Sequence, residues 1–291
     1  MEKIDMERIE VPNDFNWEEY VTLNHFFKIP FDEKSAQEHY INYGFGYGLP
    51  YNFKNIKIII YSGGKTGTAT LRTSFCKIVA SNNILSIHSN LQIRTQYTIS
   101  DIINNPRINK ILMCCSYREP ISQYLSNFFQ NIENLLGKKF DEIIDFVLLT
   151  DQIIKYMDNS KLFPHPFLEN DKKNFNNIDI FEKPFNKEKG FQIFETDKIK
   201  IILLRFDKIN QWDNIIQNNT PFTYFELASS NLTIHKPEYS LYKRVCEEII
   251  IPKTILDKIY DTEDKNMNYF YTLDEIKVIK NKWYGRLNKI N

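Results

Sequence analysis

The chain has 291 residues with 37 basic and 37 acidic side chains, so its formal net charge is zero. This balance gives no electrostatic reason to expect nucleic acid as a partner. No apolar stretch approaches the roughly 18 residues that a membrane-spanning helix needs, and the acidic N-terminus does not resemble a signal peptide. We therefore expect a cytoplasmic protein without an integral membrane segment. Its four cysteines lack metal-ligand spacing, which predicts reduced thiols and no metal site.

Residues 1–50 predict a small N-terminal helical module. Asn16 is expected to start one amphipathic helix, and Ser35 with Glu38 predicts a capping box for a second. Three glycines between residues 44 and 48 then interrupt the helical pattern. We therefore place the boundary between this module and the second domain near residue 50.

The second domain, residues 51–291, alternates strands with helices, and this order predicts an α/β fold with a P-loop-like parallel sheet flanked by helices. The expected strands are residues 56–61, 84–88, 109–116, 192–194 and 199–204. The expected helices are residues 66–80, 99–105, 119–134 and 140–157.

The first of these strands runs directly into the string GGKTGT at residues 63–68, which predicts an anion-binding loop. Backbone N–H groups at a helix start, the positive end of the helix dipole and the charge of Lys65 all favour phosphate or sulfate. A Walker A loop needs a glycine five residues before Gly64, where Ile59 stands within the strand. An ordinary P-loop NTPase is therefore disfavoured, and a P-loop-like kinase stays an alternative.

The third strand runs into Arg118, Glu119 and Pro120, and the apolar spacing after Pro120 predicts a helix. Ser126 lies on this helix, eight residues beyond Arg118. A guanidinium binds phosphate through two charge-assisted hydrogen bonds. Each residue alone is also compatible with a structural role. Both motifs, however, follow the carboxyl end of a predicted strand, where ligands of open α/β sheets bind.

Together, the two motifs resemble those of sulfotransferases that use 3′-phosphoadenosine 5′-phosphosulfate (PAPS). In that family the loop reads P-K-[ST]-G-T-[ST]-x-L, and R-[DE]-P followed by a helical serine binds the 3′-phosphate. Gly64 here replaces the usual proline and Ala69 the usual Thr or Ser. The resemblance implies a sulfotransferase fold with PAPS as cofactor and adenosine 3′,5′-bisphosphate (PAP) as product. The cofactor-binding residues that it implies are Gly64, Lys65, Thr66, Gly67, Thr68, Ala69, Thr70, Arg118 and Ser126.

Two further strings resemble proteins of glycan synthesis. Residues 14–50 resemble a small helical repeat attached to glycan-synthesis enzymes, in which we expect His25 and His39 to contribute to packing rather than to bind a ligand. The C-terminal string NKWYG at residues 281–285 resembles the family of capsular polysaccharide synthesis proteins named for NKWYS, with Gly285 in place of the serine. This resemblance implies a carbohydrate acceptor.

Near the C-terminus, Thr272 and Glu275 predict a capping box at the start of a helix whose Trp283 we expect in the core. Arg205, at the end of the last expected strand, is expected to pair within the fold.

Sulfuryl transfer to a hydroxyl is expected to be in line, and Lys65 would stabilise negative charge on the oxygen that leaves with the 5′-phosphate. A monoanionic sulfuryl group does not imply a metal. His88, at the end of the second strand, is the best candidate for the general base, ahead of Glu195 and Asp101. A non-enzymatic glycan-assembly protein is a further alternative. The sequence leaves the acceptor and the oligomeric state open.

Overall fold

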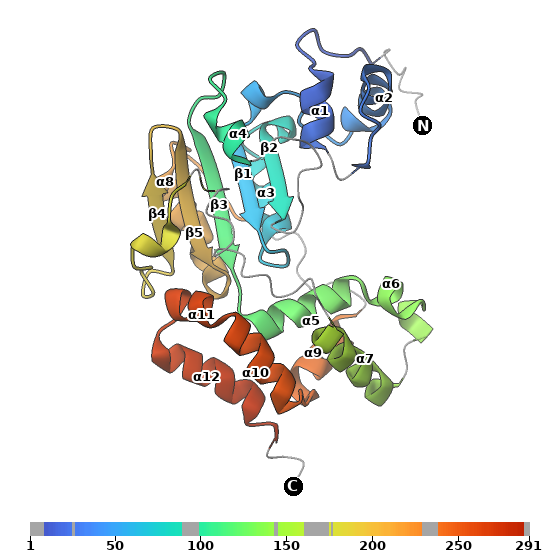
Figure 1. Ribbon diagram of the computed structural model, residues 1–291, viewed down its shortest axis with the longest axis vertical. Coiled ribbons are helices and arrows are strands. Elements are labelled where there is room, and N and C mark those ends of the chain that lie inside the picture. The colour runs from blue at the N-terminus through green and yellow to red at the C-terminus, as the bar shows by residue number, and fades with distance from the viewer. Residues whose placement is uncertain are drawn as a thin grey trace.

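The computed structural model describes residues 9–24, 27–88, 99–142, 145–159, 175, 177–228 and 238–287. A five-stranded sheet forms its centre, with helices around it (Figure 1). The strands are β1 (Ile58–Ser62), β2 (Ile84–His88), β3 (Ile111–Tyr117), β4 (Phe191–Glu195) and β5 (Ile199–Arg205). In the described part of the chain, no helix is long and apolar enough to cross a membrane.

The strands lie in the order β2-β1-β3-β5-β4. β1 pairs in parallel with β2 and β3, and β3 pairs in parallel with β5. The expected parallel sheet is therefore present in these four strands, whereas β4 pairs antiparallel with β5. The reason is the short connection, in which Thr196 N–H donates to Ile199 C=O at 2.8 Å. A hairpin of this length cannot join parallel strands, which need a longer crossover.

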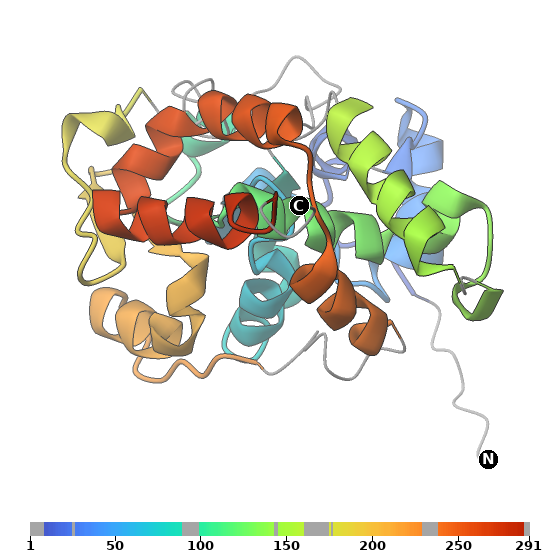
Figure 2. The same ribbon diagram turned by 90° about the horizontal axis from the view of Figure 1, so that it is seen from below.

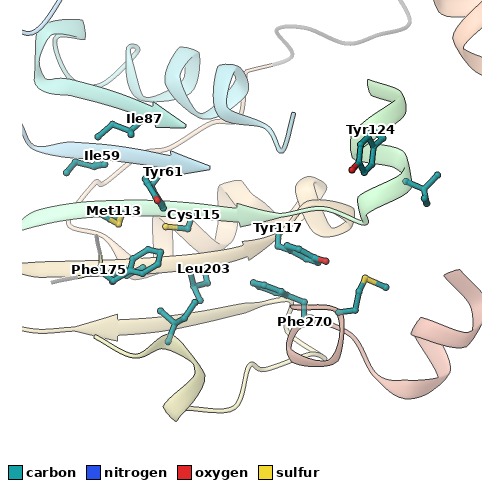
Figure 3. Close-up of a cluster of buried hydrophobic side chains, with 14 of the residues drawn as sticks. Ile59, Tyr61, Ile87, Met113, Cys115, Tyr117, Tyr124, Phe175, Leu203 and Phe270 are labelled. Carbon is teal, nitrogen blue, oxygen red and sulfur yellow. The ribbon is translucent and has the colours of Figure 1, made fainter. Parts of the chain in front are cut away.

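Alternate residues of the central strands enter two different cores. Ile59 and Tyr61 on β1 face the same side as Met113 and Cys115 on β3, and Figure 3 shows this face. Their neighbours along each strand, such as Ile60, enter the second core. Side chains of α3 (Thr68–Phe75) and α8 (Trp212–Asn219) complete that second core. Burial on both faces explains why the strands read as continuous apolar runs.

A layer of helices lies beyond the carboxyl ends of β1, β3 and β5 (Figure 1 and Figure 2). It consists of α5 (Pro120–Gln130), α6 (Ile132–Leu136), α7 (Phe146–Asn159), α9 (Tyr239–Glu248), α10 (Lys253–Thr262), α11 (Asp264–Phe270) and α12 (Leu273–Tyr284). The ring of Tyr117, the last residue of β3, stacks on Phe270 of α11 with centroids 4.5 Å apart. The sheet and the helical layer are thus packed together at the edge where each parallel strand ends.

Several expected helices differ in their ends. The helix expected at 66–80 is the shorter α3, because the chain tightens into a turn in which Ile78 and Val79 both donate to Phe75 C=O. The helix expected at 119–134 is divided at Asn131 into α5 and α6. α4 (Ile99–Asn104) agrees with its expected range, and α7 begins at Phe146, after a short 3₁₀ turn.

The N-terminal helices α1 (Trp17–Leu23) and α2 (Glu33–His39) lie toward the amino ends of β1 and β2, away from the helical layer (Figure 1). Asn16 caps α1 as expected, since its side chain accepts from Glu19 N–H at 3.0 Å. The capping box expected at Ser35 is wrong. Asp32 caps α2 instead, accepting from Ser35 N–H at 2.8 Å, because its carboxylate stands three residues earlier.

The aromatic cluster of this module includes His39, whose Nδ1 is 2.7 Å from the hydroxyl of Tyr20. The expectation that His39 packs within the module is therefore confirmed, while His25 lies outside the described residues. Glu19 connects the module to the sheet domain, because it accepts from Phe53 N–H at 2.6 Å and pairs with Arg107. The division near residue 50 stays a prediction.

Arg205 ends β5 and is only 2% exposed. Its guanidinium donates to the carboxylates of Asp207 at 2.6 Å and Glu275 at 2.8 Å, and it lies 4.3 Å from the ring centroid of Tyr271. Glu275 also completes the predicted capping box with Thr272 at the start of α12. The expectation that Arg205 pairs within the fold is confirmed. Trp283 of the same helix is buried, as expected.

Candidate functional site

The sheet has a topological switch point at its centre. From β1 the chain moves outward to β2 on one side, and then returns to place β3 on the other side. Ser62, the last residue of β1, pairs in register with Ser116 of β3, so the segments that follow both strands begin side by side. Ligands of open α/β sheets bind at such a point. The β1–α3 loop (residues 63–67) and Arg118 both lie there.

The backbone of the β1–α3 loop is unusual. Gly64, Lys65 and Gly67 have φ angles of 80°, 57° and 96°. A lysine in this left-handed region costs on the order of 1 to 2 kcal/mol, so the loop keeps this shape only because its surroundings hold it. Ile59 is fully buried in β1, which confirms that the first glycine position of a Walker A loop falls within the strand here.

The conformation of Gly64 also bears on the sulfotransferase motif. Proline is fixed near a φ of about −65°, whereas Gly64 has a φ of 80°. A proline therefore cannot occupy position 64 of this loop without a change of its backbone path. The replacement of proline by Gly64 is a larger departure from the family string than the sequence alone indicates.

Side chains of residues 116–123, from the end of β3 to the first turn of α5, bind the carbonyl groups of the loop. Gln123 Nε2 donates to Gly64 C=O at 2.7 Å and to Gly63 C=O at 3.2 Å. Arg118 Nη1 donates to Lys65 C=O at 3.1 Å, and Ser116 Oγ donates to Thr66 C=O at 2.7 Å. Four successive carbonyls are thus held by one segment of the chain, residues 116–123.

Gly67 is the N-cap residue of α3, and no side chain in the described ranges caps this helix. The N–H groups of its first turn and the positive end of its dipole make the helix start a suitable place for an anion. An added Cβ at Gly67 would lie 2.8 Å from ring atoms of Trp212, which explains why only glycine fits. Trp212 is itself fixed, since its Nε1 donates to Arg205 C=O at 2.9 Å.

The hydroxyl groups of this region have partners inside the protein. Thr66 is 2% exposed and its Oγ1 lies within hydrogen-bond distance of Ser116 Oγ, at 3.0 Å. Thr68 Oγ1 is hydrogen-bonded to Ser62 Oγ. Ala69 and Thr70 occupy the first turn of α3. Thr66 and Thr68 therefore shape the loop through their side chains.

Arg118 is half-buried and has three contacts that fix its guanidinium. Besides the bond to Lys65 C=O, its Nη2 lies 3.5 Å from the hydroxyl of Tyr242 on α9, and its Cζ lies 4.5 Å from the ring centroid of Phe206. Burial raises the pKa of Tyr242 to about 12, although the charge of Arg118 acts in the opposite direction. The hydroxyl of Tyr242 is therefore neutral at physiological pH.

Glu119 and Pro120 explain why a helix starts directly after Arg118. Pro120 is the first residue of α5, and the Glu119 carboxylate accepts from the N–H groups of Ile121 and Ser122 at 2.9 and 2.7 Å. Tyr260 also donates to Glu119, at 3.0 Å. Ser126 lies about two turns into α5, on the helix that Arg118 precedes.

The candidates for the general base fall in different places. His88 is the last residue of β2, and its backbone pairs with Ser62 at the carboxyl edge of the sheet. Its side chain lies outside what the structure describes. Glu195 lies at the opposite edge, because β4 runs antiparallel, and a hydrogen bond from Lys110 at 2.8 Å lowers its pKa. Glu195 is therefore excluded from this site.

Asp101 does not reach the β1–α3 loop either. It is exposed on α4, which leads to the start of β3 at the edge where Glu195 lies. In the described part of the chain, no group of three or more His, Cys, Asp or Glu side chains is placed to hold a metal ion.

Four residues at the site escape the sequence motifs: Ser116, Gln123, Phe206 and Tyr242. For two of them, the sequence contains a feature that could have indicated a structural role. Ser116 is a hydroxyl within a buried strand, and Gln123 is a polar residue on the buried face of an amphipathic helix. Buried polar side chains nearly always have partners, so such positions indicate a bonded network. Phe206 and Tyr242 leave no comparable signal.

No protein family, no curated protein and no solved structure matches this chain. The resemblance to sulfotransferases therefore stays a prediction that rests on the motifs of residues 63–70 and 118–126.

Proposed function

We propose that the chain is a PAPS-dependent sulfotransferase that acts on a hydroxyl group of a carbohydrate. The observation that carries this proposal is that two elements suited to anion binding meet at one switch point. The β1–α3 loop and Arg118 are linked by the hydrogen bond from Arg118 to Lys65 C=O. A nucleotide with separate 5′ and 3′ phosphates has the charge distribution that such a pair of elements would recognise.

The loop side of this site would bind the 5′-phosphosulfate. Lys65 adds a full positive charge to the N–H groups of residues 65–70 and to the dipole of α3. Ala69 offers only its N–H, since it lacks the hydroxyl of the family string. When bound, PAPS supplies the sulfuryl group that the reaction transfers, and the chain supplies the charges that stabilise the departing phosphate oxygen.

Arg118 and Ser126 would bind the 3′-phosphate. A guanidinium carries five N–H donors, and the contacts to Lys65 and Tyr242 use two of them among the described residues. Phe206 lies against the face of the guanidinium, so the edge that carries the donors stays oriented for a planar, bidentate contact. His88 is proposed to accept the proton of the acceptor hydroxyl.

Binding to immobilised PAP tests the proposal. We expect the wild-type protein to be retained, and Lys65→Ala and Arg118→Ala to weaken PAP binding by about 10- to 100-fold, because each removes a charged hydrogen-bond donor. Lys110→Ala is the matched control, since Lys110 pairs with Glu195 at the opposite edge of the sheet. Absence of PAP binding by the wild-type protein would refute the proposal.

A gain of sulfate on a panel of glycans incubated with PAPS, measured by mass spectrometry, then tests catalysis. His88→Ala should abolish the gain while PAP binding persists. Tighter binding of ATP·Mg²⁺ than of PAP would instead favour the kinase alternative. PAP binding without transfer to any hydroxyl acceptor would favour a non-enzymatic role in glycan assembly.

A further inference from the structure

The directions in which the carbonyl groups of the β1–α3 loop point determine the directions of its N–H groups. A trans peptide unit is planar, so the C=O of one residue and the N–H of the next point in opposite directions. The C=O groups of Gly63, Gly64, Lys65 and Thr66 all accept hydrogen bonds from side chains of residues 116–123. The N–H groups of residues 65–67 are therefore turned to the opposite side of the loop, whereas Gly64 N–H donates to Ser62 Oγ at 3.3 Å.

Gln123 holds two of these four peptide units with a single side-chain amide. Its Nε2 lies 2.7 Å from Gly64 C=O and 3.2 Å from Gly63 C=O, and the residue is only 8% exposed. Gly64 and Lys65, where the backbone is left-handed, form the part of the loop that most needs external support. A buried amide donor on α5 supplies this support without adding charge.

We propose that Gln123 is a positioning residue that holds the β1–α3 loop so that the N–H groups of residues 65–67 face the 5′-anionic group of the nucleotide. This inference rests on the proposed function. Because Gln123 and Ser126 lie on the same helix, α5 then serves both anionic groups of the ligand: it orients the donors for the 5′ group and carries a residue for the 3′-phosphate. Gln123 itself does not touch the ligand.

The role of Gln123 can be separated from a general structural role by comparing two ligands. PAP carries both phosphates, whereas adenosine 3′-monophosphate lacks the 5′ group. Gln123→Leu preserves side-chain size but removes the donor from both carbonyls. We expect this variant to bind PAP about tenfold more weakly and adenosine 3′-monophosphate with unchanged affinity, both measured by calorimetry. Gln130→Leu, at the exposed end of α5, is the control and should bind both ligands normally.

The outcomes are distinguishable. Equal PAP affinity in wild type and Gln123→Leu overturns the positioning role while the proposed function stands. An equal loss for both ligands also overturns it, since it indicates a general disturbance of α5. If the wild type binds neither ligand, the proposed function fails and this inference fails with it.

A measurement on the wild-type protein does not depend on any variant being folded. The chain has only nine glycines, so their amide resonances can be resolved after labelling with ¹⁵N-glycine. PAP should shift the amide proton of Gly67 downfield, because this N–H faces the side opposite Ser116. Saturation with PAP without a shift at Gly67 would overturn the proposed orientation.

Discussion

Replacing Gly67 by alanine tests whether the path of the β1–α3 loop is fixed by the second core. The added Cβ would lie 2.8 Å from two ring atoms of Trp212, a distance that requires one of them to move. Trp212 is fully buried and held by its hydrogen bond to Arg205 C=O, so a displacement of its ring is energetically costly. We expect about 1 to 3 kcal/mol from this overpacking, in addition to about 1 to 2 kcal/mol for alanine at a φ of 96°.

Gly137→Ala separates the two contributions. Gly137 has a φ of 63°, and an added Cβ there would have no neighbour within 4 Å among the described residues. This variant should therefore lose only the conformational part, about 1 kcal/mol after the lower chain entropy of unfolded alanine is counted. Urea unfolding gives both free energies. Equal losses for Gly67→Ala and Gly137→Ala would refute the reasoning that Trp212 confines the loop.

Three further predictions concern other parts of the molecule. Gly64→Pro restores the family string, yet it should abolish PAP retention, because proline cannot adopt a φ of 80°; stronger retention would show that the loop path differs from the one described. Burial raises the pKa of Glu275, but the hydrogen bonds from Arg205 and the helix cap outweigh this, and the net pKa lies below the ordinary 4.5. The contribution of Glu275 to stability is therefore complete above about pH 4.5 and is lost as the pH falls through the lower folded pKa. Glu275→Gln should make the free energy of unfolding less dependent on pH in the acid range. An unchanged dependence on pH would contradict this prediction. Cys76 is exposed, whereas burial raises the pKa of Cys114 to about 12. Cys115 is also buried, and burial raises the pKa of the half-buried Cys246. A thiol reagent should therefore show one fast phase that Cys76→Ser removes, and a fast phase that survives this substitution would contradict the slow reaction expected of Cys246.

The strands, and the parallel direction of four of them, follow from the sequence because both faces of the sheet are buried. Continuous apolar runs of this length around Ile59 and Met113 are typical of strands buried on both faces, and β2 has the bounds expected for it. The direction of β4 does not follow from its own residues. It depends on the length of the turn to β5, and this is why Glu195, at the carboxyl end of its strand, lies at the edge of the sheet opposite the site.

The residues that hold the site were less predictable than the residues proposed to bind the ligand. Lys65 and Arg118 belong to strings with recognisable spacing. Gln123 and Ser116 donate hydrogen bonds to backbone carbonyls. Since every residue has a carbonyl, the sequence does not indicate which ones are bonded. Ser35 shows the same limit on a smaller scale, because two possible caps compete and only the geometry selects Asp32.

The pairing of Arg205 with Glu275 also affects how the chain folds during its synthesis. The guanidinium that ends β5 reaches one of its two carboxylates 70 residues later in the chain, on the last helix of the fold. During synthesis, β5 can take its place in the sheet long before α12 exists, and until then Arg205 has only Asp207 to balance its charge. A buried charge that lacks part of its partners is energetically costly. We therefore expect the carboxyl end of β5 to stay exposed to solvent in nascent chains that end before α12.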